Sequence, residues 1–251
     1  MASFYHKLSA EVYDLDKPIG HWFGDVEFYL NKLQDCKGTI LEPATGTGRI
    51  LIPLLENGLS VEGFDSSSEM LQLCKKNCKK RGLAPKLIEA DMESFSMERQ
   101  YSAIILPTGS FLLLSEREKS LKALKNFYRH LNKGGKFIVD LIVQEDFKVG
   151  ETSTKIWECA NGDMITMESV NVEINYVHQY TVSLGKYERW RNGSLIETEL
   201  EHFPLRWYGV EEFKLILEKV GFDNIIISAD YCEGKYPDTN TEIITFEATK
   251  V

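Results

Sequence analysis

The chain has 251 residues, of which 43% are hydrophobic and 27% charged, so it is long enough for one α/β domain with or without an insertion. Its net charge of −9 argues against a nucleic-acid partner, which needs clustered Lys and Arg. The lack of any run of about 18 apolar residues argues against a membrane span. The five cysteines include no C-x-x-C pair, which predicts a reducing, cytoplasmic location without disulfides. The five histidines are scattered, which predicts that there is no metal site.

The N-terminal segment, residues 1–37, has the pattern of helices. Apolar side chains at helical spacing mark one face of a helix that ends before Gly38, and they are Trp22, Val26, Tyr29, Leu30 and Leu33. Ahead of this helix lies a second segment, residues 9–14, which contains Tyr13.

A strand, a tight turn, a helix and a second strand are expected over residues 39–65. The first strand carries Glu42 near its end and the second ends in Asp65. Between them, Ala44, Gly46 and Gly48 let the backbone turn sharply and allow a ligand to approach without a Cβ in the way. This unit predicts a nucleotide-binding half-fold. The Asp65 carboxylate suits a ribose, because it can accept from two neighbouring hydroxyls.

Two phosphate-binding patterns do not fit this turn. The dinucleotide pattern needs a small third residue, where Leu51 stands, and the P-loop needs a Lys after its glycines, where Arg49 stands. The remaining pattern, E-x-A-x-G-x-G over residues 42–48, resembles motif I of the class I S-adenosylmethionine-dependent methyltransferases, with Ala44 in place of the family's first glycine. The alternative is a bare turn between a core strand and a core helix, which Asp65 and the later motifs disfavour.

The resemblance implies S-adenosyl-L-methionine as cofactor and S-adenosyl-L-homocysteine as product. It implies that Asp91, near the end of a third strand over residues 86–92, accepts from the adenine amine, and that Met92 offers its backbone N–H to the ring. A tyrosine segment often folds over the cofactor in this family, which implies a lid role for Tyr13, with a packing tyrosine as the alternative. The expected cofactor-binding residues are Tyr13, Glu42, Ala44, Gly46, Gly48, Asp65, Ser66, Met70, Asp91, Met92 and Pro107.

The second half of the core follows from the same pattern of strands and helices. A fourth strand over residues 101–106 leads into a loop, residues 107–111, that borders the transferring methyl group in the family. A helix and paired glycines then precede a fifth strand over residues 137–143. Near the C-terminus, strands over residues 223–228 and 242–248 are implied to form an antiparallel hairpin at one edge of the sheet.

Residues 151–206 change to a period of two. Apolar residues recur at even positions from Val170 to Leu184, which predicts strands with one wet face. Asn-Gly pairs at residues 161–162 and 192–193 are hairpin signals. An antiparallel sheet at this point resembles the insertion of small-molecule methyltransferases such as the glycine N-methyltransferases and the aminosugar N,N-dimethyltransferases, where it roofs the substrate pocket or makes a dimer contact.

The sequence shows no general base for the methyl acceptor. The segment R-W-Y-G over residues 206–209 resembles the one before the post-insertion helix in several small-molecule methyltransferases, where an Arg can pair with a substrate carboxylate or phosphate. Salt bridges and sheet packing are the alternative roles for each side chain taken singly. The candidate acceptor contacts are Ser110, Tyr187, Arg189, Trp190, Arg206 and Tyr208.

The expected fold is α/β, with a seven-stranded, doubly wound, mostly parallel sheet whose last strand is antiparallel, and an inserted antiparallel sheet. Residues 1–37 are expected to form a helical lid, 38–150 and 207–251 the Rossmann-like core, and 151–206 a substrate cap or homodimer contact. The predicted function is transfer of a methyl group to an N or O atom of a small molecule by in-line displacement. The alternatives are an RNA or protein methyltransferase, which the acidic charge and the lack of an N-P-P-Y-like motif disfavour, and a catalytically silent cofactor-binding protein.

Overall fold

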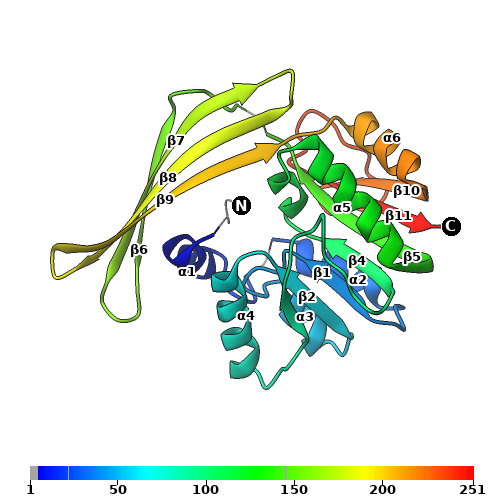
Figure 1. Ribbon diagram of the computed structural model, residues 1–251, viewed down its shortest axis with the longest axis horizontal. Coiled ribbons are helices and arrows are strands. Elements are labelled where there is room, and N and C mark those ends of the chain that lie inside the picture. The colour runs from blue at the N-terminus through cyan, green and yellow to red at the C-terminus, as the bar shows by residue number, and fades with distance from the viewer. Residues whose placement is uncertain (1–4, 22, 145) are drawn as a thin grey trace.

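The computed structural model describes residues 5–21, 23–144 and 146–251. The chain folds into a helix-flanked core sheet and a second sheet that arches away from it over the N-terminal helix (Figure 1). Trp22, which was expected on a helix face, lies outside the described residues, whereas Val26, Tyr29, Leu30 and Leu33 fall within one helix.

Helices and strands alternate along much of the described chain, and strands follow one another without a helix in three places. In chain order they are α1 (Lys7–Asp16), α2 (Asp25–Leu33), β1 (Ile40–Pro43), α3 (Leu51–Glu56), β2 (Val61–Asp65), α4 (Ser68–Lys80), β3 (Leu87–Glu89), β4 (Tyr101–Leu106), the 3-10 helix η1 (Ser110–Leu113), α5 (Arg117–His130), β5 (Leu131–Ile142), β6 (Thr152–Glu158), β7 (Met164–Asn175), β8 (Tyr180–Arg191), β9 (Ser194–Arg206), α6 (Val210–Val220), β10 (Phe222–Ala229) and β11 (Ile243–Lys250).

The core sheet has seven strands in the order β10-β11-β5-β4-β1-β2-β3. The pairs β1–β2, β1–β4, β2–β3 and β4–β5 are parallel, and β11 runs antiparallel to both of its neighbours. The strand order reverses direction at β1 and β4, which is where an open α/β sheet forms a crevice for a ligand. The predicted fold class is confirmed, including the antiparallel last strand.

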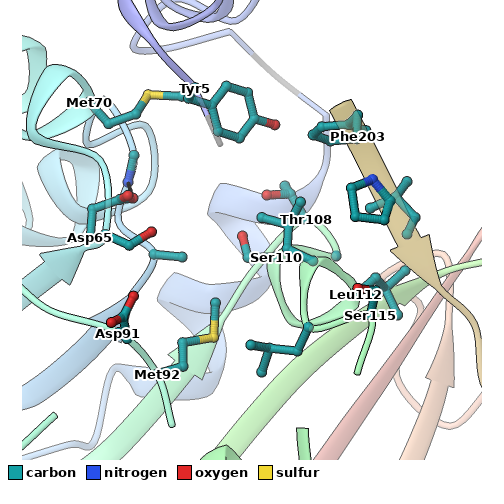
Figure 2. Close-up of a pocket in the computed structure, with 18 of the residues that line it drawn as sticks. Tyr5, Asp65, Met70, Asp91, Met92, Thr108, Ser110, Leu112, Ser115 and Phe203 are labelled. Carbon is teal, nitrogen blue, oxygen red and sulfur yellow. Dashed lines mark hydrogen bonds between the residues drawn. The ribbon is translucent and has the colours of Figure 1, made fainter. Parts of the chain in front are cut away.

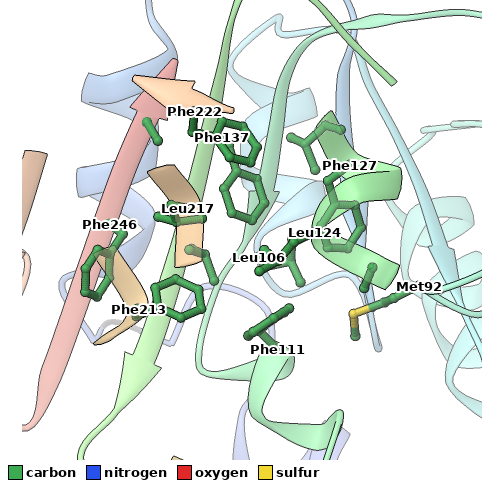
Figure 3. Packing of buried hydrophobic residues seen from close by; sticks show 14 of the residues in the cluster. Met92, Leu106, Phe111, Leu124, Phe127, Phe137, Phe213, Leu217, Phe222 and Phe246 are labelled. Atoms are coloured by element: carbon green, nitrogen blue, oxygen red, sulfur yellow. The ribbon is translucent and has the colours of Figure 1, made fainter. Parts of the chain in front are cut away.

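Two apolar layers hold the core sheet between helices. One face packs against α5 and α6 through large aromatic and aliphatic side chains, several of them fully buried, including Phe127, Phe137, Phe213 and Phe246 (Figure 3). The other face packs against α2, α3 and α4. Burial of this kind stabilises by about 25 cal/mol per Å² of apolar surface removed from water, and it fixes the ends of the strands in space.

Close backbone approach at the first turn needs glycine at two positions. Gly48 has φ +88°, and a Cβ there would lie 2.9 Å from Cys74 Sγ on α4. Gly63 on β2 leaves room for Leu51, whose Cδ1 would be 2.9 Å from an added Cβ. The large residue Leu51 therefore fits because β2, which faces it, carries the small residue Gly63.

The inserted sheet has four antiparallel strands in the order β6-β7-β8-β9. Asn192 and Gly193 both have positive φ, as the predicted two-residue hairpin requires. The predicted alternation is present, but the covered face carries the odd-numbered residues and not the even-numbered apolar ones. Odd-numbered residues such as Ile165, Tyr187 and Glu201 form the covered inner face, whereas even-numbered ones such as Leu184 and Leu200 form an outer face and are 41% and 74% exposed.

Helix α1 covers the inner face of the inserted sheet and also touches α4 of the core (Figure 1). Leu8 and Val12 pack against Ile165 and Tyr187 of the inner face, and Asn77 of α4 donates to Asp14 at 2.8 Å. No helix in the described part of the chain is long and apolar enough to span a membrane.

Candidate active site

A cavity of about 660 Å³ opens where the parallel strands of the core sheet end. Its floor comes from the residues that follow β1, β2 and β3, and the loop after β4 faces them across the space (Figure 2). The carboxyl ends of parallel strands meet at one sheet edge, so acids at successive strand ends come together there.

Asp65 is the best-defined group in this cavity. It is 8% exposed, its Oδ2 accepts from Gly46 N at 2.8 Å and its Oδ1 from Ser67 N at 2.9 Å. Burial raises the pKa of Asp65, and these backbone donors partly offset the rise. Each oxygen keeps a free lone pair, so the carboxylate can organise the glycine turn and still accept from a ligand hydroxyl.

Most of the expected cofactor residues line this cavity. They are Tyr13, Ala44, Gly46, Asp65, Ser66, Met70, Asp91 and Met92. Figure 2 shows Asp65, Met70, Asp91 and Met92 on one side and Thr108 and Ser110 on the other. Glu42, Gly48 and Pro107 are not among the lining residues. Gly48 faces Cys74, and the Pro107 carbonyl accepts from the Ser110 hydroxyl at 3.1 Å.

Glu42 and Arg49 carry buried polar atoms that the rest of the described chain does not satisfy. Glu42 Oε2, Arg49 Nε and Arg49 Nη1 have no hydrogen-bond partner within the described residues, although Arg49 also pairs with Asp25. Burial raises the pKa of Glu42, and the charge of Arg49 partly offsets the rise. Unpaired buried groups are costly, and a ligand with an ammonium and a carboxylate would satisfy an acid and a base beside the same turn.

S-adenosylmethionine fits this set of groups. Its ribose hydroxyls match the free acceptor sites of Asp65. The unsatisfied atoms of Glu42 and Arg49, which are buried and do not line the cavity, match the charges of its amino-acid end. An added Cβ at Gly46, which lines the cavity, would meet no protein atom within 4 Å, so the glycine leaves open space where a ligand needs it.

The loop after β4 is held in place by Asp140 of β5. Thr108, which has φ +54°, donates its N–H to Asp140 Oδ2 at 2.9 Å. The Tyr231 hydroxyl donates to the same oxygen at 2.9 Å, and the Thr245 hydroxyl donates to Oδ1 at 2.8 Å. Burial raises the pKa of Asp140 to about 6. The buried carboxyl therefore supports a strained residue that lines the cavity.

The N-terminal segment closes the cavity from above. Tyr5, Tyr13 and Lys17 line it, and the ring of Tyr5 packs edge-on against Tyr13 and Phe203 with centroids 5.6 and 5.9 Å apart. The Tyr5 carbonyl accepts from Ser67 Oγ at 2.6 Å, while its N–H donates to Glu201 at 3.0 Å. The main chain at Tyr5 thus joins the core to the inserted sheet.

A second cavity, of about 520 Å³, adjoins the first beneath the inserted sheet. Its walls are α1 and the inner face, with Ser169, Ser183, Tyr187 and Glu201 contributing polar groups. The two cavities share Tyr5, Tyr13, Lys17, Phe203 and Leu205 as lining residues.

The candidate acceptor contacts separate into two groups. Ser110 lines the first cavity and Tyr187 the second. Arg189 instead pairs with Glu11 and with Asp163, and Trp190 donates to Thr166 at 3.1 Å.

The two candidates at the end of β9 lie at the junction with the core. Arg206 donates to the Ser115 carbonyl at 3.0 Å, and Tyr208 is part of the aromatic core cluster. Neither they nor Arg189 or Trp190 line the two cavities.

Several lining residues were absent from the sequence-based set, including Tyr5, Lys17, Thr108, Glu201 and Phe203. Their partners lie far away in the chain, as with Tyr5 and Glu201, 196 positions apart. Only the loop residue Thr108 had a sequence signal, because residues 107–111 were expected to border the methyl group.

Comparison with known proteins adds to this geometry. Residues 40–135 match the family model of a methyltransferase domain. The chain is similar to the glycine/sarcosine N-methyltransferase of Halorhodospira halochloris, with 28% identity over 89% of this chain and 80% of that protein.

Two solved structures share the fold. One is an S-adenosylmethionine-dependent methyltransferase from Clostridium acetobutylicum ATCC 824, with a TM-score of 0.78 and 20% identity over 96% of this chain and 97% of that one. The other is the sugar N-methyltransferase KedS8 from Streptoalloteichus sp ATCC 53650, with a TM-score of 0.75 and 20% identity over 100% and 97%.

The fold and the matched domain define a methyltransferase that uses S-adenosylmethionine. Residues 40–135 match a methyltransferase domain, and the chain has the fold of the S-adenosylmethionine-dependent methyltransferases.

Proposed function

We propose that this enzyme methylates a nitrogen atom of a small molecule. The observation that carries the proposal is the pair of adjoining cavities under one roof, because α1 and the inserted sheet form walls of the space beside the cofactor cavity. A cavity of about 520 Å³ suits a small acceptor better than a macromolecule. The similar proteins from Halorhodospira halochloris and Streptoalloteichus sp are both described as N-methyltransferases.

S-adenosylmethionine, when bound, supplies a methyl group that is already activated by a positively charged sulfur. The protein then has to hold a nucleophile in line with that methyl group at contact distance. Asp65 would hold the ribose, Asp91 and Met92 the adenine, and Glu42 with Arg49 the amino-acid end. Tyr5, Tyr13 and Phe203 would exclude water above the reacting atoms.

The acceptor contacts that we retain are Ser110 and Tyr187, because each lines one of the two cavities. Arg189 and Arg206 are committed to partners within the chain, so we assign them structural roles. The five cysteines are free thiols, which supports the expected cytoplasmic location. The exposed apolar outer face supports a homodimer through the inserted sheet.

Replacing Asp65 tests the cofactor site. A charged hydrogen bond is worth about 1.5–3 kcal/mol, so Asp65→Asn should weaken S-adenosylhomocysteine binding by about tenfold to a hundredfold, at 1.4 kcal/mol per tenfold. Isothermal titration calorimetry measures this directly. Glu168→Gln is the matched control, because Glu168 lies on the inserted sheet with its side chain 57% exposed.

An assay of S-adenosylhomocysteine release with small amines, acids and phenols tests the acceptor class. We expect turnover with at least one amine. Turnover with tRNA or a protein alone would contradict the proposal, and cofactor binding without any turnover would favour a catalytically silent protein.

A further inference from the structure

Among the described residues that line the second cavity, one carboxylate is buried, that of Glu201 on β9. Its residue is 6% exposed and lies on the inner face, two positions before Phe203, which lines both cavities. Glu201 Oε1 accepts from Tyr5 N at 3.0 Å, and Oε2 accepts from the Tyr187 hydroxyl at 3.2 Å. The Ser9 hydroxyl, which donates to Glu199 at 2.7 Å, is a further donor close to it.

Glu201 has no cationic partner in the described part of the chain. The other buried acid of the inserted sheet, Asp163, pairs with Arg189 and Arg191. Within the described residues no Lys or Arg lies within ion-pair distance of Glu201. Burial raises the pKa of Glu201, and the nearby carboxylate of Glu199 raises it further. An ionised carboxylate offers about four acceptor positions, so its two oxygens can accept more bonds than the protein supplies.

Glu199 does not need a ligand, although no Lys or Arg of the described ranges pairs with it either. It accepts from Leu8 N at 2.7 Å and from Ser9 N at 3.0 Å, at the positively polarised N-terminus of α1. The two neighbouring acids of β9 therefore have different surroundings: Glu199 faces a helix end, and Glu201 faces a cavity.

We propose that the second cavity binds the cationic part of the methyl acceptor, and that Glu201 is the residue that recognises its charge. The ligand class is a small amine that is protonated when free and carries further hydrogen-bonding groups. Ser169, Asn171 and Ser183 on the same inner face supply hydroxyl and amide groups for them. The amine binds as the ammonium ion and loses one proton to water, and the nitrogen lone pair then attacks the methyl carbon as the bond from that carbon to sulfur breaks, which leaves S-adenosylhomocysteine and the methylammonium product. A buried carboxylate without a counter-ion is costly, so a cation that replaces the missing partner binds favourably.

The other charges of the cavity are consistent with this assignment. Lys155 lies 3.9 Å from Asp16, and Lys17 stands over the Tyr13 ring at 5.1 Å from its centroid. The charged groups that act on Lys17 are Arg49 and Asp25 of the core, Asp16 at the end of α1 and Lys155 of the inserted sheet, and Glu201 is not among them. Lys17 thus leaves Glu201 free, and it gives the boundary between the two cavities one cation that an amino-acid acceptor can use.

The assignment rests on the proposed N-methylation and is tested with Glu201→Gln, Glu201→Asp and Glu168→Gln. The probes are ethanolamine, glucosamine, glycine and sarcosine, with glucose and glycolate as related compounds without the amine. For the amine that the wild type methylates, Glu201→Gln should raise KM at least tenfold, which is about 1.4 kcal/mol, and leave kcat within about threefold. Glu201→Asp should fall between, and Glu168→Gln should match the wild type.

S-adenosylhomocysteine titration separates recognition of the acceptor from general damage. The Glu201 variants should bind it as the wild type does, because Glu201 is not among the lining residues of the cofactor cavity. If Glu201→Gln lowers the affinity for S-adenosylhomocysteine or the melting temperature, the KM for the amine is instead compared between the wild type and Glu201→Asp, which keeps the charge.

The two proposals fail in different ways. An amine that is methylated with an unchanged KM in Glu201→Gln would remove the role of Glu201 and leave N-methylation standing. Methylation of glucose or glycolate, or of none of the amines while S-adenosylhomocysteine still binds, would overturn the amine acceptor itself.

Discussion

Asp140 is the residue on which the exit loop of β4 depends. Its side chain is fully buried and accepts from Thr108, Tyr231 and Thr245. The unfolded chain loses this proton at its ordinary pKa of 3.8, whereas the folded chain keeps it until about pH 6. Folding therefore takes up a proton between these values, and the contribution of Asp140 to stability falls as the pH rises through them.

Asp140→Asn should remove this dependence on pH. The amide keeps one acceptor for Thr108 and Tyr231 and can donate to Thr245, while it cannot ionise. Relative to the wild type, the variant should gain about 3 kcal/mol in unfolding free energy between about pH 4 and pH 7, at 1.36 kcal/mol per pKa unit. Urea unfolding at the two pH values measures the change. Parallel curves for the two proteins would show that Asp140 has no shifted pKa.

The cofactor side of the cavity could be predicted from sequence because its residues stand at strand ends. Asp65 and Asp91 follow apolar runs, and parallel strands bring such positions to one edge. The acceptor side could not, because Tyr5 meets Glu201 only once α1 and the inserted sheet have docked. The sequence of a strand does not show whether a carboxylate on it faces a cavity or the solvent.

At the scale of elements, α1 is held at its N-terminus by a strand from elsewhere in the chain. His6 precedes the helix and makes no side-chain capping bond, while Glu199 of β9 accepts from the N–H groups of Leu8 and Ser9. A charge at this position stabilises a helix start. The lid that is expected from the sequence at residues 1–37 remains a proposal. The contact of Glu199 with the start of α1 is the place where a substitution can loosen the proposed lid.

Glu199→Gln should loosen α1 without unfolding the core. Loss of a capping interaction costs about 0.5–2 kcal/mol, so amide exchange in residues 7–16 should accelerate while β1 and β4 stay protected. Hydrogen–deuterium exchange with mass spectrometry reports both regions. Glu168→Gln should leave the exchange of α1 unchanged, and equal acceleration across the whole chain would contradict the idea of a local anchor.

The inserted sheet shows which features the alternation of apolar residues in the sequence predicts and which it does not. Alternation along residues 170–184 predicted strands correctly, and the Asn192-Gly193 turn matches its hairpin signal. The side that faces inward could not be read from it, because α1 covers a face built partly from polar residues such as Ser169 and Glu201. Val172 and Leu184, two of the apolar even positions, are left on the outside and are 38% and 41% exposed.

At the scale of the whole molecule, the proposed homodimer would pair through this outer face. Ile156, Leu184 and Leu200 are 64%, 41% and 74% exposed on it. If two copies pair there, the double variant Leu184→Lys with Leu200→Lys should convert a dimer to a monomer and leave cofactor affinity unchanged. Light scattering after gel filtration measures the mass. A wild type that is monomeric would refute pairing through this face.

The joint between core and inserted sheet at Tyr5 is made of peptide atoms. Its N–H reaches Glu201 and its carbonyl reaches Ser67. Substitution of the aromatic ring leaves this double link intact, so homologues that diverge at position 5 would lose the ring contacts with Tyr13 and Phe203 and still keep the joint between the core and the inserted sheet. Sequence conservation at position 5 would then be a poor guide to the importance of this link, whereas the spacing between position 5 and Lys7, the first residue of α1, would be a good one.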